Sequence, residues 1–349
     1  MLSVAIRKTL TSWQGRGALF MLTILCAFLV LAPFLAPYEM TKQHLSFAFH
    51  PPMALKWHEG QLCYRTYQRV MSVRYLPQSN YLPIRWWVPC HKYYLLGCLP
   101  CSHKLFGGQD EYPFFLLGTD NLGRDFFSRL LFGGRVSLSI GCLGMLITIV
   151  LGCIVGCLAG LLGGWCDVLL MRLVEFLMSI PSLYLLLALR ASIGMQLSSM
   201  PSYVMMIILL ACVGWTKSAR VIRGMVLELK MSAFVQSSQA MGQSTLLIVL
   251  KHFIPNLASY LLTAMALYVP SYILYEAALS FLGIGIQEPS TSWGLMLKYT
   301  QEDLKVFTLN LWWLLLPGFC IALTVISFNL LGDVLRDSMD TTLNLKCKH

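Results

Sequence analysis

The sequence predicts an all-α integral membrane protein with six transmembrane helices and an external insert between helices 1 and 2. Of its 349 residues, 57% are hydrophobic and only 12% are charged, whereas soluble globular chains carry about 25% charged residues. Six apolar runs also approach the roughly 20 residues that a helix needs to cross a ~30 Å hydrocarbon core. A polar stretch at residues 38–117 separates the first run from the other five.

The six runs differ in quality as membrane spans. The first follows Arg7, Lys8 and Arg16 and has no clear small-x-small cleavage site, so we expect a retained span rather than a signal peptide. The fourth is the weakest, and the fifth is longer than needed and carries Glu276, so we expect it to break or tilt near its end. The runs comprise residues 18–36, 136–162, 165–189, 200–220, 258–286 and 311–331.

The positive charges on short loops predict that both termini are cytoplasmic. Lys and Arg are enriched on the cytoplasmic side of membrane proteins. With the N-terminal tail inside, twelve of them fall inside and three, Arg190, Lys298 and Lys305, lie on short outside loops. The resulting organisation is a cytoplasmic tail and first helix (1–37), a periplasmic insert (38–117), a core with helices 2–6 (118–333) and a cytoplasmic tail (334–349).

The insert is rich in Pro, Trp, Tyr and His, which is not the composition of a linker. We expect a small, strand-rich lobe whose aromatic residues, such as those of Arg85-Trp86-Trp87, touch lipid headgroups. In an oxidising compartment its four cysteines favour structural disulfides, although spacing does not fix the pairing. A zinc site and a redox-active CxxC are the alternatives, and we assign no metal. The residues concerned are Cys63, Cys90, Cys98, Cys101, His91 and His103.

A polar segment at residues 232–256, SAFVQSSQAMGQSTLLIVLKHFIPN, stands between two apolar runs. Its pattern predicts a short helix, a break at Gly242, and a second short helix that starts after Ser244 and is stopped by Pro255. The positive-inside rule places this segment in the cytoplasm. Such an element can lie on the bilayer surface and receive force from a soluble partner; the alternative is a helix that merely rests on lipid.

Four co-linear stretches resemble the C-type permease subunit of the oligopeptide and dipeptide (peptide/nickel) ABC importer family. The resemblance covers most of residues 118–340 and implies a type I ABC importer permease fold. The stretches are Gly118–Asp125 with the residues up to Arg135, Met171–Glu175 with Ile180–Ser182, Glu276–Gly283 with Pro289 and Ser292–Gly294, and Asn329–Asp333 with Leu335–Asp337.

The resemblance implies a subunit of an ATP-driven importer for peptides in the bacterial inner membrane, forming half of the translocation pathway. The implied partners are a second, B-type permease, two cytoplasmic ATPase subunits, a periplasmic peptide-binding protein and membrane lipid. The chain has no Gly-Lys dipeptide and hence no GxxxxGK[ST] loop, so ATP and Mg²⁺ are expected on the ATPase subunits and no cofactor on this chain. We expect no enzymatic activity, and the scattered basic residues do not indicate nucleic-acid binding.

The resemblance also makes residues 232–256 the ATPase-coupling loop. The family motif there runs Glu-Ala-Ala, three residues, Gly, and a tail that ends in Leu-Pro. Gly242 and Pro255 keep their positions, Ile254 replaces Leu, and Gln236-Ser237-Ser238 replaces the triplet, which removes a carboxylate. The expected contact residues are Phe234, Gln236, Ser237, Ser238, Ala240, Met241, Gly242, Ile254 and Pro255.

Three charged residues, Asp120, Arg124 and Asp125, precede the second span, and we interpret them as a salt-bridged turn that organises an outer gate. Glu276 lies within an apolar run, where a carboxylate is costly and must face a cavity, a partner group or the bundle interior. It is a candidate for the translocation pathway or a structural hydrogen bond. Arg172 and Glu175 have the spacing of an i,i+3 ion pair.

Gly152, Gly156, Gly160 and Gly164 recur every four residues, which favours close helix packing within the chain or between subunits. Two other functions remain as alternatives. An ion-coupled secondary transporter would use Glu276 as its proton site. A membrane thiol oxidoreductase would use Cys98 and Cys101, but neither function accounts for the spacing of Gly242 and Pro255. The identity of the solute stays open, with dipeptides, longer peptides, nickel chelates and antimicrobial peptides as candidates.

Overall fold

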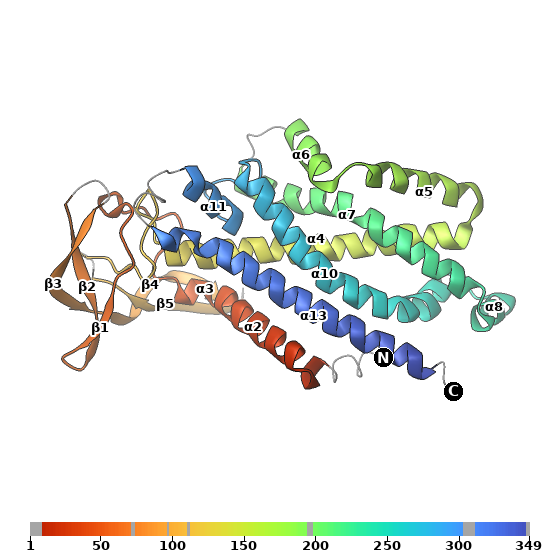
Figure 1. The fold of residues 1–349 in the computed structure, drawn as a ribbon, viewed down its shortest axis with the longest axis horizontal. Helices are drawn as coiled ribbons and strands as arrows, with labels where there is room; N and C mark the ends of the chain where they lie inside the picture. Colours follow the sequence, from red (N-terminus) through yellow and green to blue (C-terminus); the bar gives the residue numbers. More distant parts are fainter. Residues whose placement is uncertain are drawn as a thin grey trace. The chain divides into compact units, whose positions relative to one another are not determined.

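The computed structural model describes residues 9–70, 74–95, 98–109, 112–193, 198–302 and 311–346, with side chains up to residue 338. Helices dominate, and within the described residues the strands lie between the first long helix and the second (Figure 1). The helices are α2 (Trp13–Val30), α3 (Ala32–Leu35), α4 (Phe126–Leu162), α5 (Gly164–Ser179), α6 (Ser182–Ser192), α7 (Ser199–Lys230), α8 (Ala233–Ala240), α9 (Thr245–Ile248), α10 (Ile254–Phe281), α11 (Trp293–Glu302) and α13 (Leu316–Lys346).

Five helices in the described part of the chain are long and apolar enough to cross a membrane, or six if a bent pair counts as one span. The bent pair is α5 and α6, which meet at 92°. The prediction of one uninterrupted helix over residues 165–189 is therefore wrong. Pro181 lacks a backbone N–H and disfavours helical geometry at Ile180, whose ψ of 127° is extended.

Two other long helices extend beyond the predicted spans. Helix α4 begins at Phe126 rather than near residue 136, and α7 continues to Lys230 rather than ending near residue 220. Both extensions contain polar residues, which hydropathy counts against a membrane span but which helices accommodate readily outside the hydrocarbon core. Helix α10 ends at Phe281 and contains Pro270 in its interior.

The insert is strand-rich, as predicted. Strands β1, β2 and β3 form an antiparallel sheet in chain order, and β4 pairs with β5 in a second, two-stranded antiparallel sheet. Tyr64, Phe114 and Phe115 are buried in the apolar cluster of this lobe. The strands are β1 (Leu55–His58), β2 (Gln61–Arg69), β3 (Tyr75–Pro83), β4 (Arg85–Leu95) and β5 (Leu99–Gly107) (Figure 1).

The chain divides into two compact units. One comprises residues 1–22, 138–276 and 324–349, and it contains segment 232–256. The other comprises residues 23–137 and 277–323, and it contains the insert and the charged cluster that precedes α4.

The glycine repeat on α4 packs against α7 within the first unit. A Cβ atom built on Gly152 would lie 2.5 Å from Cβ of Ser218, and one on Gly156 would lie 2.8 Å from the carbonyl oxygen of Ala219. Gly160 meets Val226 in the same way, at 2.7 Å. The two helices therefore approach through these three glycines, whereas Gly164 starts α5 and has no atom within 4 Å of its Cβ position.

Candidate functional site

Segment 232–256 begins as the sequence predicts. Helix α8 spans Ala233–Ala240, Gly242 adopts a φ of +75°, and Ser244 is the N-cap residue of α9. A φ near +75° favours glycine because it has no Cβ to clash with the backbone. The Gly242 turn thus reverses the chain between two short helices.

The end of the segment differs from the prediction. Helix α9 continues through a π-helical turn, Val249–Phe253, directly into α10, which begins at Ile254. Pro255 therefore does not stop a helix but lies in the first turn of the long one. Proline has no N–H to bond back along the helix, and the π turn just before it changes the hydrogen-bond spacing at this point. The segment is thus joined to α10 without a break in the helical backbone.

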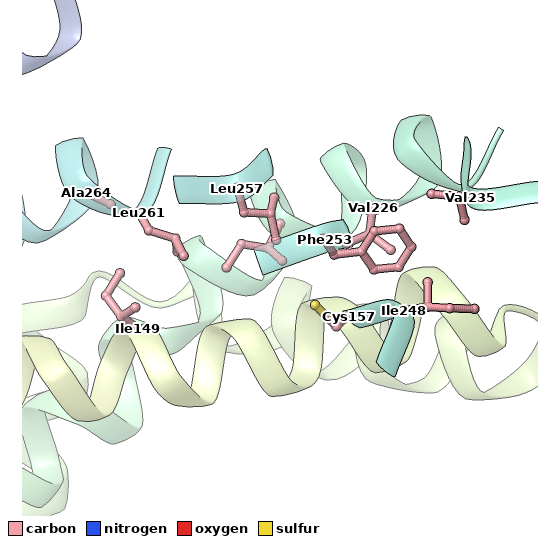
Figure 2. Packing of buried hydrophobic residues seen from close by; sticks show 10 residues of the cluster. Ile149, Cys157, Val226, Val235, Ile248, Phe253, Leu257, Leu261 and Ala264 are labelled. Carbon is pink, nitrogen blue, oxygen red and sulfur yellow. The ribbon is translucent and has the colours of Figure 1, made fainter. Parts of the chain in front are cut away.

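Three apolar side chains anchor the segment to the helices of its own unit. Val235 of α8, Ile248 of α9 and Phe253 of the π turn are buried, and they pack in one cluster with Val226 of α7 and Cys157 of α4. Figure 2 shows Phe253 beside Val226, and it shows Ile248 on the same side of Phe253 as Cys157. Burying side chains of this size contributes about 1.5–3 kcal/mol each, so the segment is bound to the bundle rather than lying loosely on lipid.

The opposite face of the segment is exposed and partly apolar. Met241 at the turn is 71% exposed and Leu246 at the start of α9 is 69% exposed. Most of the expected contact residues lie on the exposed side, but Ser238 is buried and Ile254 is only half-exposed. The exposed members of the expected set are Phe234, Gln236, Ser237, Ala240, Met241, Gly242 and Pro255.

Sequence reasoning missed His252. It lies in the π turn, where its Nε2 is 3.0 Å from Oγ of Ser238 and its ring centroid is 5.8 Å from that of Phe234. These contacts join the first helix of the segment to its exit. No signal in the sequence distinguishes this histidine from any other polar residue of the segment.

The second site is a buried ion network in the other unit. Nε of Arg124 lies 2.7 Å from Oδ2 of Asp120, and its Nη1 lies 2.9 Å from Oε1 of Glu288. Arg129 reaches the same two carboxylates, with its Nη2 3.1 Å from Glu288 and its Nε 3.7 Å from Asp120. Two arginines and two carboxylates thus share one network, which ties the turn before α4 to the loop after α10. The sequence indicated Asp120 and Arg124 but not Arg129 or Glu288.

Asp125 does not belong to this network, contrary to the expectation that it forms one charged cluster with Asp120 and Arg124. Its Oδ2 accepts hydrogen bonds from the backbone N–H and the hydroxyl of Ser128, at 2.8 and 2.5 Å. The carboxyl is completely buried, and desolvation raises its pKa to about 7 although the Ser128 bonds act in the opposite direction. It caps the start of α4.

A cavity of about 20 Å³ adjoins the network, between Asp120, Arg129 and Tyr299. This volume accommodates about one water molecule. The gap beside Asp120 and Arg129 is therefore the size of one water molecule.

The remaining candidates are placed as follows. Glu276 is 0% exposed in α10, so it faces the bundle interior. Arg172 and Glu175 form the expected ion pair, at 2.9 Å.

The cysteines of the insert do not form the disulfides that the sequence favoured. Cys63, Cys90, Cys98 and Cys101 are all free thiols in the structure. Cys63 is buried on β2 of the three-stranded sheet, whereas the other three belong to the β4–β5 hairpin, so the strand pairing separates the first from the rest. Among the described residues, no group of three or more His, Cys, Asp or Glu side chains is placed to hold a metal ion.

The sequence of the helical part matches that of a known protein family. Residues 149–344 match the family described as "Binding-protein-dependent transport system inner membrane component". The chain belongs to this family. This binding-protein-dependent permease component is accordingly a multi-pass inner-membrane protein, and membership bears out the expectation of a transporter component rather than an enzyme. The matched region includes segment 232–256 and excludes the strand-rich insert.

Several curated relatives of the permease component are similar over most of their length. It is 38% identical to the dipeptide transport system permease protein DppC of Bacillus subtilis, over 65% of this chain and 68% of that one. It is 39% identical to the oligopeptide transport system permease protein OppC of Escherichia coli K12, over 64% and 71%. An inward-facing structure of the MetNI methionine ABC transporter is similar at a TM-score of 0.46 and 19% identity, over 60% and 96%.

Proposed function

We propose that this chain is the C-type permease subunit of an ATP-driven importer for dipeptides or oligopeptides, and that residues 232–256 receive mechanical work from a cytoplasmic ATPase. The observation that carries the proposal is that one face of this segment is buried and the other is exposed. One face is buried against the helix bundle through Val235, Ile248 and Phe253, and the other presents Met241 and neighbouring residues outward. The similarity to the dipeptide permease DppC and the oligopeptide permease OppC supports the peptide class of the solute.

In this mechanism the segment transmits force in two steps. An ATPase subunit binds the exposed face at Phe234 and Met241, and its movement on ATP binding displaces α8 and α9. Because α9 runs through the π turn into α10 as one continuous helix, the displacement reaches the membrane span directly. π turns inside helices are frequent at functional sites.

The proposed assembly contains a second, B-type permease, two ATPase subunits that carry ATP and Mg²⁺, and a periplasmic peptide-binding protein. Both termini and segment 232–256 then face the cytoplasm, and the insert faces the periplasm. Glu276 is the proposed interior group nearest the solute route, and the Asp120–Arg124 network the proposed outer closure. Outward opening of that closure would separate the turn at Asp120 from the loop at Glu288.

The decisive experiment uses Gly242→Asp. A Cβ at Gly242 meets no atom within 4 Å, and Asp tolerates a positive φ better than most residues, so the chain itself accommodates the substitution. The new carboxylate would project into the ATPase contact. We expect loss of ATP-dependent peptide uptake and of ATPase co-purification while the chain remains inserted.

The matched control is Gly60→Asp. Gly60 has the same φ of +75° and also meets no atom within 4 Å, but it lies in the β1–β2 turn of the insert. Uptake should be retained in this variant. Normal uptake and ATPase binding in Gly242→Asp would refute the coupling assignment, and co-purification with the partner subunits followed by uptake assays on a panel of peptides tests the solute class.

A further inference from the structure

The insert contains a cavity that the transport mechanism does not use. It has a volume of about 830 Å³, within the range of about 300–1,000 Å³ that small-molecule sites occupy. The β4–β5 hairpin forms one wall, and residues 37–44 form another. Pro33 of α3 and Phe132 of α4 also line it, so the cavity borders the end of the first long apolar helix.

The charges around this cavity are mainly positive. Lys42, Lys92 and Lys104 line it against one carboxylate, that of Glu39. Lys104 is half-buried, and its Nζ donates a hydrogen bond to the carbonyl oxygen of Pro37 at 3.0 Å. His44 lines the cavity as well, and its buried Nε2 makes no hydrogen bond within the described residues. The cavity is thus rich in hydrogen-bond donors and poor in hydrogen-bond acceptors.

The groups next to Lys104 do not neutralise the cavity. Burial lowers the pKa of Lys104, while nearby Cys90, Glu39 and Asp125 favour its charged form. Because the pKa of Asp125 itself is raised to about 7 by burial, this carboxyl is partly protonated at neutral pH. An excess of positive charge therefore remains for a ligand.

The same hairpin has exposed tryptophans of the kind that are found at membrane interfaces. Trp86 and Trp87 on β4 are 53% and 63% exposed. The ring of Trp87 packs against Phe34 of α3, with centroids 5.6 Å apart. Exposed tryptophans beside the end of an apolar helix are typical of the headgroup level of a bilayer. The cavity is lined by residues of this hairpin and by Pro33, the residue before Phe34.

We propose that this cavity binds the phosphate of an anionic phospholipid headgroup, with Lys42, Lys92 and Lys104 as its ligands and Trp86 and Trp87 in contact with the surrounding headgroups. Basic pockets beside membrane helices bind anionic headgroups through the same chemistry. Lysine binds phosphate as a point charge and requires no fixed planar geometry. The site would fasten the insert to the outer surface of the membrane independently of peptide transport.

The test measures lipid binding to the delipidated full-length protein in detergent by native mass spectrometry. Phosphatidylglycerol, phosphatidylcholine and free glycerol 3-phosphate are added separately. We expect phosphatidylglycerol to bind at least about tenfold more tightly than phosphatidylcholine, and Lys42→Gln with Lys92→Gln to remove most of this preference. Both lysines are exposed, so the double variant should fold, which circular dichroism verifies.

The matched control is Lys56→Gln with Arg74→Gln, which removes the same charge from exposed positions of the insert that do not line the cavity. This control should retain the lipid preference. Equal binding of the two lipids, or an equal loss in the control, would overturn the proposal. If glycerol 3-phosphate bound as tightly as the lipid, the site would be one for soluble phosphate compounds and the headgroup assignment would be wrong. Peptide uptake is not part of the readout, so the outcome is independent of the proposed function.

Discussion

Ser238 and His252 are 14 positions apart, yet Oγ of Ser238 and Nε2 of His252 lie 3.0 Å from each other. The Ser238 hydroxyl donates its single proton to the carbonyl oxygen of Phe234 at 2.9 Å. His252 Nε2 is therefore assigned as the donor to Ser238. Ser238 stands where the resembling family motif has its second alanine, which could not accept this bond. The substituted triplet thus introduces a new polar link across the coupling segment.

This link should be measurable in a double-mutant cycle with Ser238→Ala and His252→Phe. We expect an interaction energy of about 1 kcal/mol, the usual net contribution of a partly buried hydrogen bond. Thermal unfolding of the four proteins in detergent provides the measurement. Strict additivity of the two single substitutions would show that the pair contributes nothing. ATPase activity stimulated by peptide should fall in both single variants, because the link between α8 and the π turn is then weaker.

The close approach of α4 to α7 predicts a large effect of a small substitution. Gly152→Val should destabilise the protein by about 1–3 kcal/mol, because even its Cβ would come within 2.5 Å of Ser218. Gly224→Ala on α7 is the control, since a Cβ there meets no atom within 4 Å. It should be neutral or slightly stabilising, given the higher helix propensity of Ala. Similar melting temperatures for the two variants would contradict the packing.

The buried network predicts that Glu288 contributes to the stability of the protein through its ion pairs with the two arginines. Glu288→Gln leaves Asp120 as the one carboxylate of the network beside Arg124 and Arg129, and we expect a loss of about 1–3 kcal/mol. The control is Glu302→Gln, since the Glu302 side chain is exposed and its partner Lys298, half-buried, lies 3.5 Å away. Exposed ion pairs contribute about 0–1 kcal/mol, so this control should melt within about a degree or two of the unchanged protein. Equal effects of the two substitutions would refute the network.

Two buried groups predict opposite pH dependences of stability. The pKa of Asp125 is raised by burial from 3.8 to about 7, so its contribution is fully present below pH 3.8 and is lost as the pH rises through about 7. The pKa of His50 is lowered by burial from 6.5 to about 4, against its hydrogen bond with Pro51. Its contribution is present above pH 6.5 and is lost as the pH falls through about 4.

Between about pH 4 and 6.5 these two dependences oppose each other. Asp125→Asn should therefore reveal a melting temperature that falls as the pH is lowered through this range. His50→Asn should reveal a melting temperature that rises as the pH is lowered through the same range. Melting curves in detergent at half-unit intervals would test both signs. Parallel curves for the two variants would show that at least one group is not buried as described.

The sequence alone determined the features that depend on local signals. Apolar runs of about the length needed to cross the hydrocarbon core predicted the long helices. Gly242 and Ser244 predicted the turn of the coupling segment. Asp120 and Arg124 are four residues apart, so their pairing was visible as well. Each of these signals is confined to one short stretch of chain and needs no knowledge of the neighbours.

Tertiary structure decided which groups complete each site. Glu288 joins Arg124 across 164 positions, and His252 reaches Ser238 only because Phe253 and Val235 are buried in one cluster. Pro255 reads as a helix stop in sequence, yet a π turn carries the helix past it. Contacts of this kind arise from the packing of distant segments, whose energies a local pattern does not contain. Local chemistry therefore sets the elements, and burial sets their partners.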